Sequence, residues 1–333
     1  MYLRLGKCSA LVLNPGPHEK RCSMNFVNIL YEIIALIALI LLGYFCFKIK
    51  LFNSQSSQVM STLILHISFP ALIIVSMNRA YSNDLLHNSL ALIGISIVIY
   101  LILLLLAEVW GRKTKRPHEQ SSVLKWIVIF GNCSFMGFPI INAIYGGIGV
   151  FYAAVFNMFY IFLMFSYGIA ILQKGASKSL MKSLLNPGLI ATVIGFTLFI
   201  LKISLPYVIL RPMQMIGDTT IPLALITTGI SLAQIPLREL VRPVDIWIAA
   251  LIRLIILPAA VLLALTPFHL NQFLIAIPTI LIGTPVALTA GVFALNYGCD
   301  DQLASKGVVL SNFLAIVSMP AVVWAVMLVL HAA

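Results

Sequence analysis

The sequence predicts an all-α membrane protein in which ten transmembrane helices form two inverted five-helix repeats, with helices 4 and 9 broken and crossed. Three observations indicate this class: an apolar composition, ten apolar runs between short polar loops, and proline motifs that recur in both halves. Of 333 residues, 61% are hydrophobic and 9% are charged, and the mean hydropathy is +1.05. A soluble domain carries about 45–50% apolar and 25% charged residues. Soluble enzymes and DNA-binding domains are therefore excluded.

Apolar runs between polar breaks predict the ten helices in order, and most are long enough to cross a bilayer. In the first half the runs are Val27–Phe47, Val59–Met77, Leu85–Val109, Leu124–Tyr145 and Val150–Leu172. In the second half they are Leu184–Leu201, Tyr207–Leu232, Val244–Leu265, Asn271–Tyr297 and Ala304–Leu330. Together they occupy nearly the whole chain, so no sizeable domain is expected outside the membrane.

The distribution of basic residues predicts the orientation. The loops after spans 1, 3, 5, 7 and 9 hold 13 Lys and Arg, and the opposite loops hold three, which are Arg79, Lys202 and Arg211. The 13 are Lys48, Lys50, Arg112, Lys113, Lys115, Arg116, Lys125, Lys174, Lys178, Lys182, Arg238, Arg242 and Lys306. By the positive-inside rule the first set is cytoplasmic and both termini lie outside, in a plasma membrane or bacterial inner membrane. The net charge of +11 therefore reflects topology, and no nucleic-acid partner is expected.

Residues 1–23 do not fit this orientation, because they place Arg4, Lys7, Lys20 and Arg21 on the outer side. They contain neither an apolar core nor the cleavage site of a signal peptide. We expect translation to start at Met24, with 1–23 a non-native extension, 24–173 the first repeat and 174–333 the second. An intact mass of natively expressed protein that begins at Met1 would contradict this.

The cysteines give no sign of a metal site or a disulfide framework. They are scattered, without a CxxC pair or a His/Cys cluster. The five are Cys8, Cys22, Cys46, Cys133 and Cys299. No metal and no cofactor is expected.

Proline motifs relate the two halves. Ser68-Phe69-Pro70-Ala71-Leu72 in span 2 resembles Ile221-Pro222-Leu223-Ala224-Leu225 in span 7, and the prolines are 152 residues apart (222 minus 70). Gly137-Phe138-Pro139 in span 4 resembles Gly283-Thr284-Pro285 in span 9, at an offset of 146 (285 minus 139). Because each unit has five spans, the second copy is inverted across the membrane. Inverted repeats with interrupted helices are typical of secondary transporters.

The Gly-x-Pro motifs predict helix breaks near the bilayer midplane. Proline removes a backbone N–H and its ring clashes with the preceding turn, while glycine loosens the helix. Backbone groups freed within the membrane must be satisfied by protein, water or ligand. The half-helix N-termini would present N–H groups and a positive dipole end to an anion. Alternatively, these are ordinary proline kinks that bind nothing.

Residues beside the two breaks are the candidate substrate-binding site. They are Asn132, Cys133, Gly137, Phe138, Pro139, Gly283, Thr284 and Pro285. Amide and hydroxyl groups there could bind a carboxylate or satisfy freed backbone groups. Asn157 and Asn312 are equally explained by bonds between helices, and Tyr145 and Tyr297 by interfacial belts.

Three ionisable residues are candidates for charge or proton coupling, because charges inside a membrane are costly. Arg253 lies inside span 8 and could balance a substrate carboxylate, pair with an acid or extend to the cytoplasmic face. His66 and Asp218 each precede a symmetric proline, Pro70 or Pro222, by four residues. Either could take up a proton, although Asp218 could instead cap a helix.

These motifs together resemble the auxin efflux carrier family, which includes plant auxin exporters and bacterial malonate or malate carriers. The stretches that carry the resemblance are Gly131 to Pro139, Asn186-Pro187-Gly188-Leu189-Ile190, Ile221 to Leu225, Gly229-Ile230-Ser231-Leu232, and Pro285 to Ala287 continuing to Asn296-Tyr297-Gly298. They cover nearly all of residues 26–330. The long cytoplasmic loop of the plant exporters is absent, so the bacterial carriers are the closer comparison.

The resemblance implies a homodimeric carrier of small organic anions, such as dicarboxylates or auxin-like weak acids. It implies a scaffold of helices 1, 2, 6 and 7 and a moving transport domain. The alternatives are a sodium-coupled carrier similar to the bile-acid symporters, and a non-transport membrane protein. Spans 4 and 9 contain no acidic residue for a sodium site. Neither an ATP-binding motif nor a catalytic pair with usable spacing occurs, so we do not expect an enzyme.

Overall fold

The computed structural model describes residues 26–113, 116–173, 186–234 and 244–332, and this part of the chain is all-helical. Six helices in it are long and apolar enough to cross a membrane. Three shorter apolar helices, Ile34–Lys48, Pro187–Ile200 and Gln272–Ile282, accompany them. The prediction of an all-α, multi-pass membrane protein is confirmed. Residues 1–23, with Cys8 and Cys22, lie outside the described residues.

The helices follow the predicted apolar runs, with several interruptions. In the first half they are α1 (Phe26–Lys48), α2 (Ser54–Leu63), η1 (Ile64–Ser68), α3 (Phe69–Met77), α4 (Asn83–Lys113), α5 (His118–Ile129), η2 (Cys133–Gly137), α6 (Phe138–Leu163), η3 (Met164–Gly168) and α7 (Ile169–Leu172). In the second half they are α9 (Pro187–Ile200), α10 (Tyr207–Asp218), α11 (Thr220–Ala233), α12 (Val244–Leu251), η5 (Ile252–Ile256), α13 (Leu257–Leu265), η6 (Thr266–Phe268), α14 (Gln272–Ile282), α15 (Ala290–Asn296) and α16 (Asp301–Ala332).

Three of the interruptions are π-helical turns that come directly before a proline. The turns η1, η2 and η5 end just before Phe69-Pro70, Phe138-Pro139 and Leu257-Pro258. Because proline cannot donate to the preceding turn and its ring displaces a carbonyl group, one extra residue in that turn accommodates it. The helix therefore continues past these prolines, with a local widening in place of a break.

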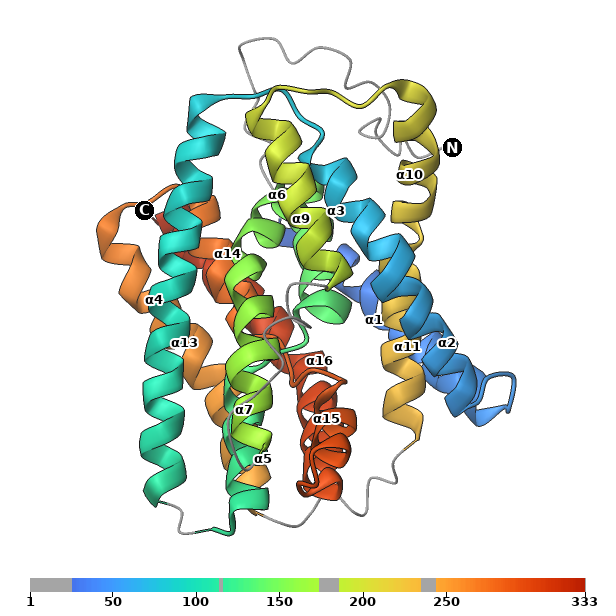
Figure 1. Ribbon diagram of the computed structural model, residues 1–333, viewed down its shortest axis with the longest axis vertical. Helices are drawn as coiled ribbons and strands as arrows, with labels where there is room; N and C mark the ends of the chain where they lie inside the picture. Colours follow the sequence, from blue (N-terminus) through green and yellow to red (C-terminus); the bar gives the residue numbers. More distant parts are fainter. Residues whose placement is uncertain (1–25, 114–115, 174–185, 235–243, 333) are drawn as a thin grey trace.

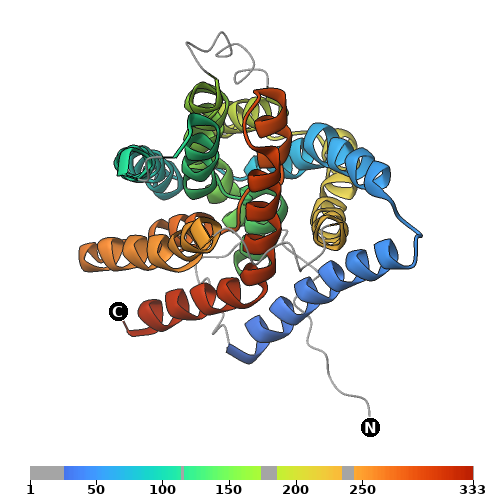
Figure 2. The same ribbon diagram turned by 90° about the horizontal axis from the view of Figure 1, so that it is seen from below.

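Two groups of helices flank a central segment (Figure 1). In one group, α1 packs along α11, and α3 packs against α9 and α10. In the other group, α4 packs against α5 and α6, and α13 packs against α14. Seen from below, α16 runs between the two groups (Figure 2), where it contacts α12, α14 and α11. The α1–α11 contact is close enough to need glycine: a Cβ on Gly229 would lie 1.9 Å from the carbonyl oxygen of Ile40.

The helical segment from Cys133 to Leu172 lies at the centre of the molecule. In its most hydrophobic stretch 67% of residues are buried by protein, against 28% for α4. This segment turns sharply at Gly146, whose φ of 62° is in the left-handed region that favours glycine. The buried half of the fold is therefore organised around η2 and α6.

Candidate functional site

The two predicted breaks lie against each other in the centre of the fold. Residues 130–132 separate α5 from η2, and residues 283–289 separate α14 from α15. Gly131 and Val286 form an antiparallel bridge. The N–H of Asn132 donates to the carbonyl of Pro285 at 2.6 Å, and the N–H of Ala287 donates to the carbonyl of Phe130 at 3.3 Å. Each break thus satisfies backbone groups that the other has freed.

The first break is not at Pro139, where the motif placed it. The chain leaves helical geometry at Phe130 and resumes it at Cys133, so Pro139 lies inside a continuous η2–α6 helix and is buried. The π turn absorbs the missing N–H of Pro139, as described above. Pro285, by contrast, lies within the second break, and its carbonyl accepts the Asn132 bond. The predicted ninth span is therefore two helices joined by a non-helical segment.

Asn132 begins the central helix. Its side-chain oxygen accepts from the N–H of Phe135 at 3.2 Å, and its carbonyl accepts from Met136 and Gly137 at 3.2 Å. The N–H groups of Cys133 and Ser134 come before the first of these helical bonds, so the helix presents them at its N-terminus. The side-chain Nδ2 of Asn132 is buried and has no hydrogen-bond partner among the described residues.

Arg253 is fully buried behind the breaks. Its Nη1 donates to the carbonyls of Val128 and Ile129 at 2.8 Å each, and its Nε donates to the carbonyl of Thr284 at 2.9 Å. These carbonyls end α5 and follow the end of α14, so one guanidinium caps the negative ends of two half-helices. Among the described residues Arg253 pairs with no acid and does not extend to the surface. The structure thus shows a capping role in place of the acid pair or the extension to the cytoplasmic face, and Nη2 of Arg253 has no hydrogen-bond partner among the described residues.

Gly131 is required by the position of this guanidinium. A Cβ on Gly131 would lie 1.8 Å from Nη2 of Arg253 and 2.4 Å from Oγ1 of Thr284. Any side chain would therefore displace Arg253 from the carbonyls that it caps. Gly137 likewise lies against α14, where a Cβ would come within 2.6 Å of Leu281.

Side chains from α6 and α16 hold the paired breaks from opposite sides. The hydroxyl of Tyr160 donates to the carbonyl of Gly131 at 2.5 Å. Ser311 accepts from the N–H of Val286 at 3.0 Å, and Asn312 donates to the carbonyl of Val286 at 3.4 Å. Gly131 and Val286 are the two residues of the bridge, so each bridge residue receives support from a neighbouring helix.

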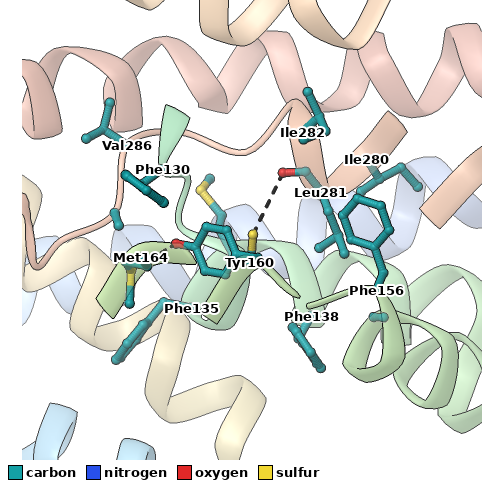
Figure 3. Packing of buried hydrophobic residues seen from close by; sticks show 14 of the residues in the cluster. Phe130, Phe135, Phe138, Phe156, Tyr160, Met164, Ile280, Leu281, Ile282 and Val286 are labelled. Carbon is teal, nitrogen blue, oxygen red and sulfur yellow. Dashed lines mark hydrogen bonds between the residues drawn. The ribbon is translucent and has the colours of Figure 1, made fainter. Parts of the chain in front are cut away.

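A ring of aromatic side chains surrounds the first break (Figure 3). Phe130, Phe135, Phe138 and Tyr160 are buried around η2, and the Cys133 thiol points toward the carbonyl of Leu281 at 3.9 Å. Phe138 also packs edge-on against Phe69 of α3, with ring centroids 4.8 Å apart. Water is thereby excluded from most of the crossing.

One cavity opens beside the N-terminus of η2. Its volume is about 80 Å³, and its walls come from η1, α3, residues 131–135, α6 and η3, the start of α9, and residues 287–289. Asn132, Ser134 and Asn186 contribute polar groups to it, and so does Thr289, whose hydroxyl is buried without a partner among the described residues. The Asn132 amide and the first N–H groups of η2 thus belong to residues that line one small cavity.

The structure divides the predicted binding residues into two sets. Asn132 and Cys133 line the cavity. The remaining six pack within the crossing outside it: Gly137, Phe138, Pro139, Gly283, Thr284 and Pro285. The Thr284 hydroxyl donates to the carbonyl of Leu281 at 2.6 Å, so it serves the backbone of α14.

The other candidates lie away from the cavity walls. His66 is exposed on η1, with Nδ1 3.0 Å from the carbonyl of Thr62. Asp218 is exposed and ends α10; the residue that precedes α11 is Thr219, so the capping interpretation of Asp218 is wrong. Pro70 and Pro222 lie in the first turns of α3 and α11.

Sequence reasoning missed part of the cavity wall. Tyr160, Thr289 and Gly188 line the cavity without any break motif of their own. Asn186 belongs to a stretch that carries the family resemblance. Its side-chain oxygen also caps α9 by accepting from the N–H groups of Gly188 and Leu189. The pair Asn186-Pro187, an N-cap followed by proline at the first helical position, was the available signal.

Comparison with known proteins assigns this architecture to a class. The family described as membrane transport protein matches residues 28–181 and again 174–323. An uncharacterized transporter of Methanothermobacter thermautotrophicus is 25% identical over 92% of this chain and all of its own length. An uncharacterized transporter of Methanocaldococcus jannaschii is 23% identical over 73% of this chain and 79% of its own length. The uncharacterized transporter YfdV of Escherichia coli is 21% identical over 87% of this chain and 95% of its own length.

The chain is thus a multi-pass membrane transporter. It belongs to the membrane transport protein family, which is the auxin efflux carrier family that its motifs resemble.

Proposed function

We propose that this protein is a secondary carrier that moves small organic anions across the membrane. The observation that supports it most is the cavity beside η2, where a buried amide without a partner and a helix N-terminus meet. In this proposal the carboxylate of the substrate accepts hydrogen bonds from Asn132 Nδ2 and from the N–H groups of Cys133 and Ser134. The Thr289 hydroxyl provides one further donor.

The electrostatics of the crossing favour an anion at this position. A helix N-terminus carries about half a positive elementary charge. The negative ends of α5 and α14 would oppose this field, but Arg253 neutralises them through three carbonyl bonds. In a buried, low-dielectric site the remaining positive field acts strongly on a carboxylate.

The size of the cavity favours a small substrate. At about 80 Å³ it is well below the 300–1,000 Å³ typical of ligand pockets. A dicarboxylate with few carbon atoms therefore needs less widening of the site than an aromatic auxin-like acid. We expect short dicarboxylates such as malonate and malate to be preferred over indole-3-acetate.

The transport movement that we propose follows from which helices line the cavity. Its walls combine η1, α3 and α9 with the breaks and α6. In the proposed ten-span arrangement, α1, α2–α3, α9 and α10–α11 form the scaffold, and the crossing moves against it as an elevator or by rocking. The family's two matches over the two halves support the inverted repeats. The protein would be a homodimer, with both termini outside the cell or, in a bacterium, in the periplasm.

A sodium-coupled carrier is the rival, and the position of Arg253 argues against it. Sodium would need several oxygen ligands at the crossing. The carbonyls of Val128, Ile129 and Thr284 already bind a guanidinium there. A second cation beside it would be repelled.

Currents from proteoliposomes on a solid-supported membrane test the proposal. The panel contains malonate, malate, other small carboxylates and indole-3-acetate, at two pH values and with or without sodium. Saturable currents that do not depend on sodium are expected, and their pH dependence shows whether protons are coupled. Currents that require sodium would favour the rival, and absence of current in folded protein across the panel would contradict the substrate class.

A further inference from the structure

A second pocket lies at the opposite end of the fold from the α4–α5 connection. Its volume is 440 Å³, and its walls are residues 78–81 between α3 and α4 and residues 202–204 between α9 and α10. These connections run together at the upper end of Figure 1. The N–H of Leu205 donates to the side-chain oxygen of Asn78 at 2.9 Å, which ties the two connections together.

Two basic side chains line this pocket from the two connections. Arg79 donates from Nε to the carbonyl of Ser76 at 2.8 Å, and its guanidinium lies against Gly147, where a Cβ would come within 2.7 Å of Nη2. The Lys202 ammonium lies over the Tyr81 ring, 4.7 Å from its centroid. These contacts hold both cations at the same pocket.

Neither cation is neutralised by an acid. Among the described residues the ion pairs are Arg116–Asp245 and Lys125–Glu108, so neither Arg79 nor Lys202 takes part in one. Asp84, in the first turn of α4, is exposed and pairs with neither. Desolvation lowers the pKa of Arg79, yet a guanidinium remains protonated at physiological pH. Within the part of the chain that the structure describes, the pocket therefore holds two positive charges without an ion-pair partner.

Each of these basic residues follows a helix C-terminus, but helix-end chemistry does not explain why the two share one pocket. Lys202 follows α9 with a φ of 59°, and Lys50 follows α1 in the same way with a φ of 63°. A lysine after a helix C-terminus is favoured by the helix dipole. Arg79 likewise follows the C-terminus of α3, and its Nε donates to the last-turn carbonyl of Ser76. The positive-inside rule nevertheless disfavours it, because the loops on this side contain only three basic residues. Two of those three line one pocket.

We propose that this pocket binds a small oxyanion from solution, a carboxylate or phosphate, between Arg79 and Lys202. The planar guanidinium suits two oxygens of one carboxylate, and the ammonium provides a second charge on a flexible stem. Asn78 and Ser204 add polar groups to the wall of this pocket. This anion site is separate from the cavity beside η2, and it does not depend on which substrate, if any, that cavity carries.

Protection of Lys202 from an amine-reactive reagent tests the proposal directly. The intact protein in nanodiscs of neutral phosphatidylcholine exposes both faces, and mass spectrometry reports labelling of the Lys202 peptide. Saturating malonate or inorganic phosphate should slow this labelling about tenfold relative to sodium chloride at equal ionic strength, as expected for a charge-assisted contact. Transport is not measured, so failure here and failure of the carrier proposal are distinguishable.

Three variants show which residues the protection of Lys202 depends on. Arg79→Gln should abolish it, whereas Arg211→Gln, which removes a basic residue of the same side outside the pocket, should leave it unchanged. Asn132→Leu should also leave it unchanged, because that residue belongs to the other cavity. Size-exclusion profiles show that each variant is folded.

Several results would overturn the proposal. Equal protection by sodium chloride and malonate would mean that no specific site exists. Retained protection in Arg79→Gln would mean that Arg79 is not a ligand. Loss of protection in Asn132→Leu would place the anion in the η2 cavity. If phosphatidylglycerol nanodiscs protect Lys202 while malonate does not protect it in neutral nanodiscs, the occupant is a lipid headgroup and the proposed soluble anion is wrong.

Discussion

The two breaks begin from the same Gly-x-Pro motif and fold differently. At the first break, Pro139 is absorbed by a π turn, and the chain is non-helical only at residues 130–132. At the second, Pro285 lies in a non-helical segment from 283 to 289. The first break produces a capped helix N-terminus beside a cavity. The second supplies two carbonyl acceptors: that of Thr284 accepts from Arg253, and that of Pro285 accepts from the N–H of Asn132.

One motif therefore lies beside a cavity in one copy and supplies structural carbonyls in the other, which fits the proposal that only the first copy binds substrate. A proline can be accommodated by widening a helix or by ending it, and the neighbouring residues decide which occurs. After the first break a long helix resumes, so its dipole is available at the cavity. After the second, α15 has seven residues.

Replacing Arg253 should have the largest effect. Arg253→Met removes three hydrogen bonds and leaves the carbonyls of Val128, Ile129 and Thr284 buried without a partner. We expect the free energy of unfolding to fall by about 4 kcal/mol. Thermal unfolding in detergent measures this. Arg253→Lys keeps the charge but not the planar guanidinium, so its stability should lie between those of Arg253→Met and the wild type. Equal stability of all three proteins would contradict the capping role.

A methyl group should distinguish the two breaks sterically. Gly131→Ala places a Cβ 1.8 Å from Arg253 Nη2, and the displacement should cost about 2 kcal/mol. The matched variant Gly283→Ala meets Pro258 at 3.3 Å and should cost less than about 1 kcal/mol. Chemical unfolding of both variants provides the comparison. A larger loss in Gly283→Ala would reverse our account of which break is tightly packed.

Removing each proline should sharpen the contrast. Pro139→Ala restores an N–H inside a continuous helix, so transport should remain close to the wild-type rate. Pro285→Ala loosens the segment whose carbonyl receives the Asn132 N–H, and transport should fall several-fold while stability changes by about 1 kcal/mol or less. Initial rates in proteoliposomes measure both. The opposite order would place the functional break at Pro139.

The smallest effects on binding are expected from the proton-coupling candidates. His66 and Asp218 are exposed and do not line the cavity. His66→Gln and Asp218→Asn should therefore leave anion affinity unchanged, and a role in coupling would show only as a loss of the pH dependence of transport. Currents at two pH values separate these readouts. A tenfold loss of affinity in either variant would mean that the residue reaches the site in another state.

The sequence predicted the all-helical membrane fold and the meeting of the breaks because apolar runs and proline pairs are local signals. It did not predict where the first break falls, since residues 130–132 leave helical geometry where they pair with residues 285–287, which are distant along the chain. It placed Arg253 inside a helix but not its carbonyl partners, because those lie more than 30 residues away along the chain. Thr289 and Tyr160 reach the cavity only through tertiary packing.

We propose that the anion binds at the first break and not at the second. Calorimetric titration of malonate into the purified protein, Asn132→Ala and Thr284→Val tests it most directly. The account predicts affinity about tenfold weaker for Asn132→Ala, which loses a buried donor, and unchanged for Thr284→Val, whose hydroxyl serves Leu281. Wild-type affinity in Asn132→Ala together with weak binding in Thr284→Val would contradict it.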